Sequence, residues 1–280
     1  MSLLGAAGCR NPLGGGGGDG EAAPEAPPGA PTGSEPASAP GGAPAAVPSS
    51  TAPPTPTSAP ASSSAPAAAS SAAPSAVRAV TAAESKPVYE LDAARRVVAL
   101  TIDDGPDPKH TPIVLALLQQ YGIRATFFLI GENAAEHPAL VREIADRGHH
   151  IANHTWTHPD LRELSEGKVR DELERTSDLL HRATGRAPTW FRAPGGDWGS
   201  SSLKVAAGLG MRPMAWSVDP RDWARPGTTV ITDRVLKDVR PGAIVLNHDG
   251  GGDRSQTVAA LKAYLPVLID SGYRFTAPPS

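Results

Sequence analysis

The chain has 280 residues, and its 26 lysines and arginines nearly balance its 29 aspartates and glutamates, for a formal net charge of −3. This balance, without a basic run or basic residues interleaved with aromatic ones, argues against nucleic-acid binding. No apolar stretch approaches the roughly 20 residues that a membrane span needs, and the single cysteine, Cys9, excludes an internal disulfide.

The first part of the chain differs in composition from the rest. Residues 11–77 hold 15 of the 30 prolines among alanine, serine, glycine and threonine, and they contain no lysine, arginine or aromatic residue. Such a segment cannot bury enough apolar surface to offset the entropy that ordering costs. We therefore predict a disordered Ala/Pro/Ser/Gly-rich tail or linker over residues 1–85. Residues 86–280 then form one folded domain, long enough for a single sizeable core.

Cys9 has two interpretations. The stretch LLGAAGC places small residues directly before the cysteine, which resembles the end of a bacterial lipoprotein signal. The stretch lacks a basic n-region and a full apolar segment, so this interpretation requires that the true start of the protein lie upstream. The alternative is an incidental cysteine in the tail. On the first interpretation the domain is exported, extracellular or associated with the cell envelope, and tethered by a lipid anchor at Cys9.

After residue 86, strand patterns alternate with helix patterns. Apolar, β-branched and aromatic runs predict seven strands, over 97–102, 125–131, 149–155, 189–193, 212–218, 242–247 and 272–276. Apolar residues at helical spacing predict six helices, over 111–121, 134–147, 162–183, about 200–209, 228–239 and 255–271. This alternation predicts an α/β fold with a parallel sheet, either a barrel or a doubly wound open sheet.

Polar residues follow five of the predicted strands, at the point where each strand ends. They are Asp103 and Asp104 after the first strand, His154 and His158 after the third, Arg192 and Pro194 after the fourth, Asp219 and Asp222 after the fifth, and His248 after the sixth. In α/β barrels and open sheets, active sites are built at the carboxyl ends of the strands. The convergence of five strand ends therefore predicts a functional site.

Each motif also has a purely structural interpretation. DDG is an ordinary turn sequence, FRAPGGDW is consistent with a stiff turn, and SVDPRDW with an acidic loop whose Trp223 lies in the core. His154 and His158 are spaced i, i+4, which on a helix brings both to one face. With a nearby carboxylate they form a ligand set that suits zinc or non-haem iron. A lone histidine such as His248 is more often structural, and we expect His110 on the surface.

The ordered motifs TIDDG, HTWTH, RAPGG, DPRDW and LNH are similar to the five motifs of the polysaccharide deacetylases, carbohydrate esterase family four. The resemblance covers roughly residues 94–277. It implies a distorted (β/α)7 barrel, one divalent metal ion and hydrolysis of N-acetyl or O-acetyl groups on sugar polymers. The metal is usually zinc in this family, with cobalt, nickel and manganese as alternatives.

The same resemblance implies a role for each motif. Asp104, His154 and His158 would bind the metal, which lowers the pKa of a bound water and polarises the acetyl carbonyl. Asp103 would be the general base that takes the proton of the water. Arg192 would pair with Asp103 and hold it ionised.

The remaining motifs supply the acid and the substrate contacts. His248 would be the general acid that protonates the leaving amine, and Asp222 would orient it and favour its charged form. The backbone amide of Gly195 would stabilise the oxyanion. Further substrate contacts are assigned to Pro194, Trp223 and Leu246. The chain departs from the family at Ile102, where Phe is common, and at Gly195, where many members have Tyr; the second change leaves the substrate contacts there in doubt.

The substrate remains open among several acetylated glycans. N-deacetylation of N-acetylglucosamine in peptidoglycan or in chitin-type oligosaccharides is the first expectation, and O-deacetylation of acetylxylan on the same site is the alternative. A catalytically inactive glycan-binding module and a non-haem iron oxygenase are the other classes, although the oxygenases usually adopt a jelly roll rather than an α/β fold. We expect a monomer.

Overall fold

The computed structural model describes residues 79–92, 95–196 and 198–278. Cys9 and residues 1–78 of the predicted tail lie outside the described residues, so the interpretations of Cys9 remain predictions. No helix in the described ranges has both the length and the apolar character to cross a membrane.

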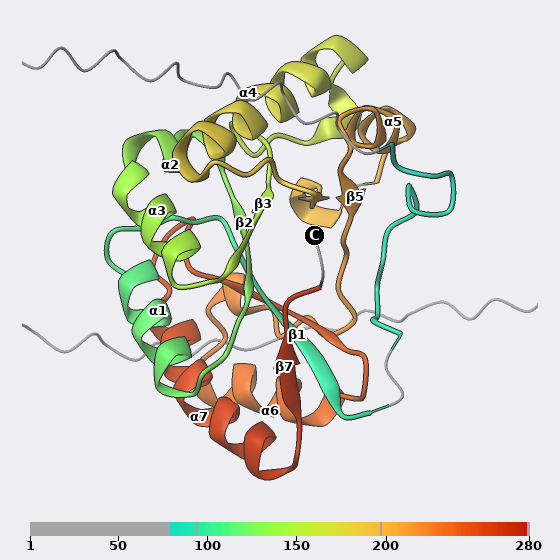
Figure 1. Cartoon of the computed structure of the whole chain (residues 1–280). Helices are drawn as coiled ribbons and strands as arrows, with labels where there is room; N and C mark the ends of the chain where they lie inside the picture. Colours follow the sequence, from blue (N-terminus) through green and yellow to red (C-terminus); the bar gives the residue numbers. More distant parts are fainter. Residues whose placement is uncertain (1–78, 93–94, 197, 279–280) are drawn as a thin grey trace, which may run out of the picture. The chain divides into compact units, whose positions relative to one another are not determined.

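A seven-stranded sheet lies at the centre of the described chain (Figure 1). Its strands are β1 (Val97–Asp103), β2 (Thr126–Leu129), β3 (His150–Asn153), β4 (Trp190–Phe191), β5 (Arg212–Pro213), β6 (Ile244–His248) and β7 (Arg274–Thr276). Neighbouring strands run parallel in the order β5-β4-β3-β2-β1-β6, and β7 also pairs with β1. The α/β fold and the distorted (β/α)7 barrel are thereby confirmed.

The helices lie on the outer side of the curled sheet (Figure 1). They are α1 (Thr111–Gln120), α2 (Gly131–Glu136), α3 (Pro138–Asp146), α4 (Glu166–Thr184), α5 (Ser200–Gly208), α6 (Thr228–Asp238) and α7 (Ser255–Asp270). The prediction of one helix over 134–147 is wrong, because α2 and α3 meet at His137 and Pro138. Proline lacks an N–H and clashes with the preceding turn, so a new helix starts there.

The predicted strand over 212–218 is interrupted. Beyond β5, pairing is limited to isolated bridges at Met214 and Val218. The carbonyl oxygens of Met214 and Ala215 accept hydrogen bonds from the side chain of Arg192, at 3.0 and 2.9 Å. The buried guanidinium of Arg192 therefore binds two carbonyl oxygens that would accept hydrogen bonds from a neighbouring strand if the strand were continuous. The barrel is distorted at these residues.

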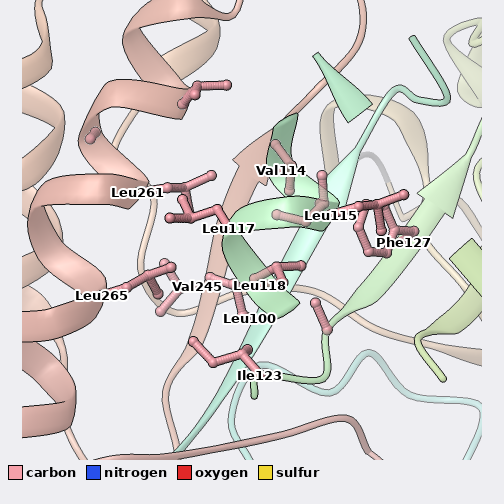
Figure 2. Packing of buried hydrophobic residues seen from close by; sticks show 14 of the residues in the cluster. Leu100, Val114, Leu115, Leu117, Leu118, Ile123, Phe127, Val245, Leu261 and Leu265 are labelled. Carbon is pink, nitrogen blue, oxygen red and sulfur yellow. The ribbon is translucent and has the colours of Figure 1, made fainter. Parts of the chain in front are cut away.

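Side chains along β1 alternate between two environments. Val98, Leu100 and Ile102 belong to the main apolar core between the sheet and the helices, part of which is shown in Figure 2. Ala99 belongs to a smaller cluster on the other face of the sheet. Because residues two apart in a strand share a face, Asp103 lies on the inner side with Ala99, away from the helices.

The main core predicts the effect of a truncation at its centre. Leu100 is fully buried against α1 and β6 side chains such as Leu118 and Val245 (Figure 2). We expect Leu100→Ala to lower the free energy of unfolding by about 3 kcal/mol, through lost apolar burial and the remaining cavity. Urea denaturation measures this change. The matched truncation of the exposed Val230 on α6 should cost less than about 0.5 kcal/mol; equal losses would contradict the assignment of the core.

Candidate metal centre and catalytic pocket

The carboxyl ends of the strands surround a pocket of about 390 Å³. Asp103 ends β1 and lies in register with Phe128 on β2 and His248 on β6, so the parallel pairing places these strand ends side by side. The lining residues are Asp103, Asp104, His154, His158, Ala193, Gly195, Trp216, Asp219, Trp223, Leu246 and His248. Residues at or after the carboxyl ends of five strands, β1, β3, β4, β5 and β6, thus meet in one cavity.

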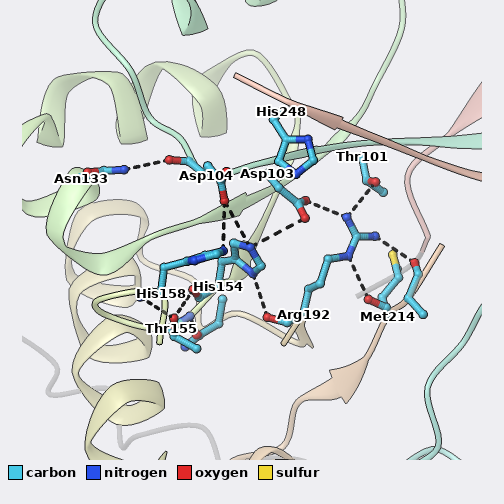
Figure 3. Close-up of polar contacts among 12 residues, drawn as sticks. Thr101, Asp103, Asp104, Asn133, His154, Thr155, His158, Arg192, Met214 and His248 are labelled. Atoms are coloured by element: carbon cyan, nitrogen blue, oxygen red, sulfur yellow. Dashed lines mark hydrogen bonds and ion pairs between the residues drawn. The ribbon is translucent and has the colours of Figure 1, made fainter. Parts of the chain in front are cut away.

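Asp104, His154 and His158 form a triad in this pocket (Figure 3). Asp104 Oδ1 lies 3.4 Å from the Nε2 atom of each histidine, and the three ligand atoms lie within 4.8 Å of one another. Asp104 Oδ1 is buried and has no hydrogen-bond partner within the described part of the chain. One carboxylate oxygen and two imidazole nitrogens form a ligand set that fits a divalent cation such as zinc.

Backbone and hydrogen bonds orient the triad. His154 Nδ1 lies 2.8 Å from the carbonyl oxygen of Arg192. A carbonyl oxygen can only accept a hydrogen bond, so Nδ1 carries the proton in the neutral ring, and Nε2 presents its lone pair to the pocket. Asp104 and His158 have left-handed backbone, with φ of 71° and 59°. HTWTH forms a loop after β3, and its left-handed residues, Thr155 and His158, bring the two rings together. Burial would raise the pKa of Asp104, but the surrounding histidines, His154 first, lower it below its usual value.

Asp103 is paired with a fully buried arginine. Arg192 Nη1 donates to Asp103 Oδ1 at 2.7 Å and to Thr101 Oγ1 at 2.9 Å (Figure 3). Burial lowers the pKa of the Arg192 guanidinium, while the charge of Asp103 and the hydrogen bond to it act in the opposite direction. The second oxygen of Asp103, Oδ2, lies 3.8 Å from His154 Nε2. One carboxylate oxygen is therefore held by the arginine, and the other lies beside the triad.

His248 is paired with the fully buried Asp222. The ring Nδ1 lies 2.7 Å from Asp222 Oδ1, and the His248 backbone N–H donates to Oδ2 at 2.8 Å. Thr257 Oγ1 also donates to Oδ2 at 2.8 Å. Burial alone would lower the pKa of His248, but the hydrogen bond and charge of Asp222, with smaller contributions from Asp104 and Asp103, raise it to about 9. The metal-free protein therefore has a cationic His248 at neutral pH.

The structure brings most of the predicted site residues to the pocket wall and places three behind it. Arg192, Pro194 and Asp222 are buried and do not line the pocket. Gly195 lines it with a left-handed backbone, φ 64°, which favours glycine at this position. Trp223 is 52 % exposed at the pocket, so the alternative of a core tryptophan is wrong.

Several residues near the pocket were missed by the motif analysis. His110 was expected on the surface but is 3 % exposed, and its Nε2 accepts a hydrogen bond from the backbone N–H of Arg254. Asp249, directly after His248, is fully buried. Trp216 lines the pocket. The run HDGGG gave a local signal for Asp249, but the burial of His110 depends on contacts about 140 residues away in the chain.

Comparison with known proteins gives a consistent family. A family model described as polysaccharide deacetylase matches residues 90–214. A peptidoglycan-N-acetylglucosamine deacetylase of Bacillus cereus is 43% identical over 189 residues, which are 67% of this chain and 88% of that protein. A chitooligosaccharide deacetylase of Bradyrhizobium sp. (strain ANU 289) is 46% identical over 190 residues, 64% of this chain and 87% of that protein.

A solved structure has the same fold. It is a crystal structure of a peptidoglycan N-acetylglucosamine deacetylase in complex with 4-naphthalen-1-yl-N-oxidanyl-benzamide. It superposes with a TM-score of 0.66 at 38% sequence identity, and the match covers 68% of this chain and 90% of that chain. The structural match thus covers about the same share of the chain, 68%, as the sequence match with the Bacillus cereus deacetylase, 67%.

The Asp222–His248 pair predicts a pH dependence of the metal-free protein. Because the pKa of His248 is raised in the folded state, the pair stabilises the fold fully below about pH 6.5, and this stabilisation is lost as the pH rises through about 9. We expect Asp222→Asn to lower the pKa of His248 toward its ordinary value near 6.5, measured by NMR titration of the ring. Asp270→Asn, at the exposed end of α7, is the control and should leave this pKa in place. An unchanged His248 pKa in Asp222→Asn would contradict the assigned cause.

Proposed function

Because the chain belongs to the polysaccharide deacetylase family, we propose that it is a metal-dependent hydrolase that removes acetyl groups from N-acetylglucosamine residues of a glycan. The observation that most strongly supports this proposal is the pocket itself. It combines a ligand triad for a cation, a carboxylate beside that triad and a cationic histidine on the neighbouring strand end. Metal-dependent hydrolysis of an amide uses these three elements: an electrophilic cation, a base and an acid.

Asp104, His154 and His158 would hold the metal, and zinc is the metal we propose. When bound, zinc polarises the acetyl carbonyl and acidifies a water molecule. The buried Asp104 Oδ1, unpartnered within the described residues, and the two histidine Nε2 atoms at 3.4 Å from it support this assignment. Cobalt, nickel and manganese accept similar nitrogen and oxygen ligands and are tested with zinc below.

Asp103 would act as the general base. Its Oδ2 lies beside the triad and accepts the proton of the attacking water, while Oδ1 stays bonded to Arg192. The charge-assisted hydrogen bond from the arginine fixes the orientation of the carboxylate. Water oxygen then bonds to the acetyl carbon, and Asp103 holds the proton that the water loses.

His248 would act as the general acid. With Nδ1 bonded to Asp222, the ring presents Nε2–H to the pocket, and this proton moves to the departing nitrogen as the carbon–nitrogen bond breaks. The step releases acetic acid and an amine, which exchange a proton to give acetate and an ammonium group, and the proton left on Asp103 replaces the one that His248 donated. We assign to the backbone N–H of Gly195 the stabilisation of the oxyanion, about 3 kcal/mol for one donor in comparable sites. Leu246 and Trp223 would line the space for the acetyl methyl group, with Pro194 supporting the turn.

Peptidoglycan or chitin-type oligosaccharides are the substrates we propose. The two relatives described above are named for N-acetylglucosamine and chitooligosaccharide deacetylation, which supports N-deacetylation over the acetylxylan alternative. An inactive glycan-binding module is less well supported, because each side chain that the reaction requires is present. We further propose that the protein is exported and acts on the cell-wall glycan as a monomer, with Cys9 as a lipid anchor.

Two substitutions separate the base from the metal ligands. We expect Asp103→Asn to retain zinc and to lower kcat by about 100- to 10,000-fold, because the amide cannot accept the proton of the water. His154→Ala should instead lose zinc, measured by metal analysis after dialysis. Near-full activity of Asp103→Asn at neutral pH would show that the base is another group.

Acetate release tests the reaction and the substrate. The full chain is assayed on peptidoglycan, chitin oligosaccharides and acetylated xylan, before and after EDTA treatment and after addition of zinc, cobalt, nickel or manganese under nitrogen. We expect release from the first two glycans, loss with EDTA and recovery with zinc without oxygen. Acetate release confined to xylan would favour the acetylxylan esterase. Glycan binding without acetate release would favour an inactive module, and a requirement for oxygen would favour an oxygenase.

A further inference from the structure

We propose that Asp249, together with Thr111, is a positioning residue that holds the turn bearing Asp104 in the conformation that binds the metal. This inference rests on the proposed metal site of Asp104, His154 and His158. Asp249 does not line the pocket, so it acts through the turn and not on the substrate.

Asp249 lies beside the end of β1. It follows His248, which is in register with Asp103, and its backbone N–H donates to the Asp103 carbonyl oxygen at 3.1 Å. Its side chain is fully buried. The hydrogen-bonded pairing of β1 and β6 therefore continues for one residue past the end of β6 and brings the Asp249 carboxyl to the turn at Asp104 and Gly105.

The carboxyl group fills the space where Gly105 has no side chain. A Cβ atom added at Gly105 would overlap Asp249 Oδ1, and one added at Gly250 would overlap the carbonyl oxygen of Asp104. The turn and the segment after β6 are thus in direct contact along their backbones. Glycine at position 105 is required here by close approach of a neighbouring side chain.

One hydrogen-bond chain fixes the carboxyl group from the opposite side. Thr111 Oγ1 donates to Asp249 Oδ2 at 2.7 Å, and the same hydroxyl accepts from the backbone N–H of Asp107 at 2.8 Å. Thr111 is the first residue of α1 and is fully buried. Asp249 is therefore tied to the start of α1, which follows the turn in the chain.

The other carboxyl oxygen of Asp249 contacts the turn without a polar partner. Oδ1 is buried and, in the part of the chain that the structure describes, makes no hydrogen bond. Burial, with the nearby charges of Asp104 and Asp107, raises the pKa of Asp249 to about 7, against the hydrogen bond from Thr111. The packing of Oδ1 against Gly105 and the hydrogen bond of Oδ2 with Thr111 are the contacts through which Asp249 acts on the turn.

The turn needs such support because its backbone is strained. Asp104 has φ 71°, a conformation that costs a non-glycine residue about 1–3 kcal/mol and persists only when its surroundings impose it. On one side, Asn133 Nδ2 donates to the Asp104 carbonyl oxygen at 2.8 Å (Figure 3), and the Ile130 N–H donates to the Gly105 carbonyl oxygen at 3.0 Å. From the segment after β6, Asp249 packs against Gly105. The direction of the Asp104 carboxylate follows from this clamp.

The test measures zinc affinity of the full chain. Metal-free protein is titrated with zinc against a chromophoric chelator, and the thermal unfolding of each metal-free variant is recorded. We expect Asp249→Ala to raise the zinc Kd by about 10- to 100-fold, the usual effect of losing a residue that orients a ligand. Thr111→Val should raise it in the same direction, and the double variant should be no worse than Asp249→Ala, because the two residues act as a unit.

Two further variants make the outcome specific. Asp249→Asn keeps the shape of the side chain and an acceptor for Thr111, so its zinc Kd should stay within about threefold of the wild type. Thr126→Val is the control for Thr111→Val, since Thr126 is also fully buried and its hydroxyl, among the described residues, has no partner; its zinc Kd should not change.

The results separate this inference from the proposed function. If the wild type does not bind zinc, the proposed metal site is wrong. If the wild type binds zinc and folded Asp249→Ala and Thr111→Val bind it equally well, Asp249 is merely structural and the inference is overturned, whatever the loss of thermal stability. If Asp249→Ala fails to fold, the zinc Kd of Thr111→Val decides whether the inference holds. If Asp249→Asn and Asp249→Ala weaken zinc binding equally, the proposed role of Asp249 in packing against the turn is also overturned.

Discussion

One fully buried cation, the guanidinium of Arg192, organises the catalytic end of the barrel. A charge removed from water is tolerated only where hydrogen bonds and a counter-charge surround it. Arg192 meets this condition with Asp103 and Thr101 on β1 and with the carbonyl oxygens of Met214 and Ala215 beyond β5. The Phe128 ring lies 4.1 Å from its guanidinium carbon. Its own backbone carbonyl oxygen lies 2.8 Å from His154 Nδ1, so one residue orients both the candidate base and a candidate ligand.

The two adjacent aspartates differ because the strand ends between them. Asp103 is the last residue of β1 and keeps the inward direction that strand alternation imposes. Asp104 turns into left-handed backbone, and its carboxylate meets the two histidines instead of Arg192. Neighbouring side chains of the same type thus face different partners, which is how one short motif supplies both a proposed ligand and a proposed base.

The sequence predicted the seven strands and the residues at their carboxyl ends, because apolar periodicity and turn residues are local properties. It was less successful where distant groups compete for the backbone. The strand over 212–218 is interrupted because Arg192 binds two of its carbonyl oxygens. The burial of His110 was missed because the residue that it contacts, Arg254, lies 144 positions further along the chain. The break between α2 and α3 could have been anticipated from Pro138, a local signal that the helical spacing outweighed.

The amino-acid sequence by itself determined the α/β class, the order of the elements and which polar residues follow which strands, since these depend on the pattern of neighbouring side chains. Tertiary structure alone decided which of those residues meet. Parallel pairing of β1 with β2 and β6 brings Asp103 beside His248, and left-handed turns aim Asp104 and His158 at one point. The tertiary structure also brings the Asp249 side chain against the turn at Gly105. Such contacts join residues that are far apart in the chain, and only the folded chain satisfies their geometry together.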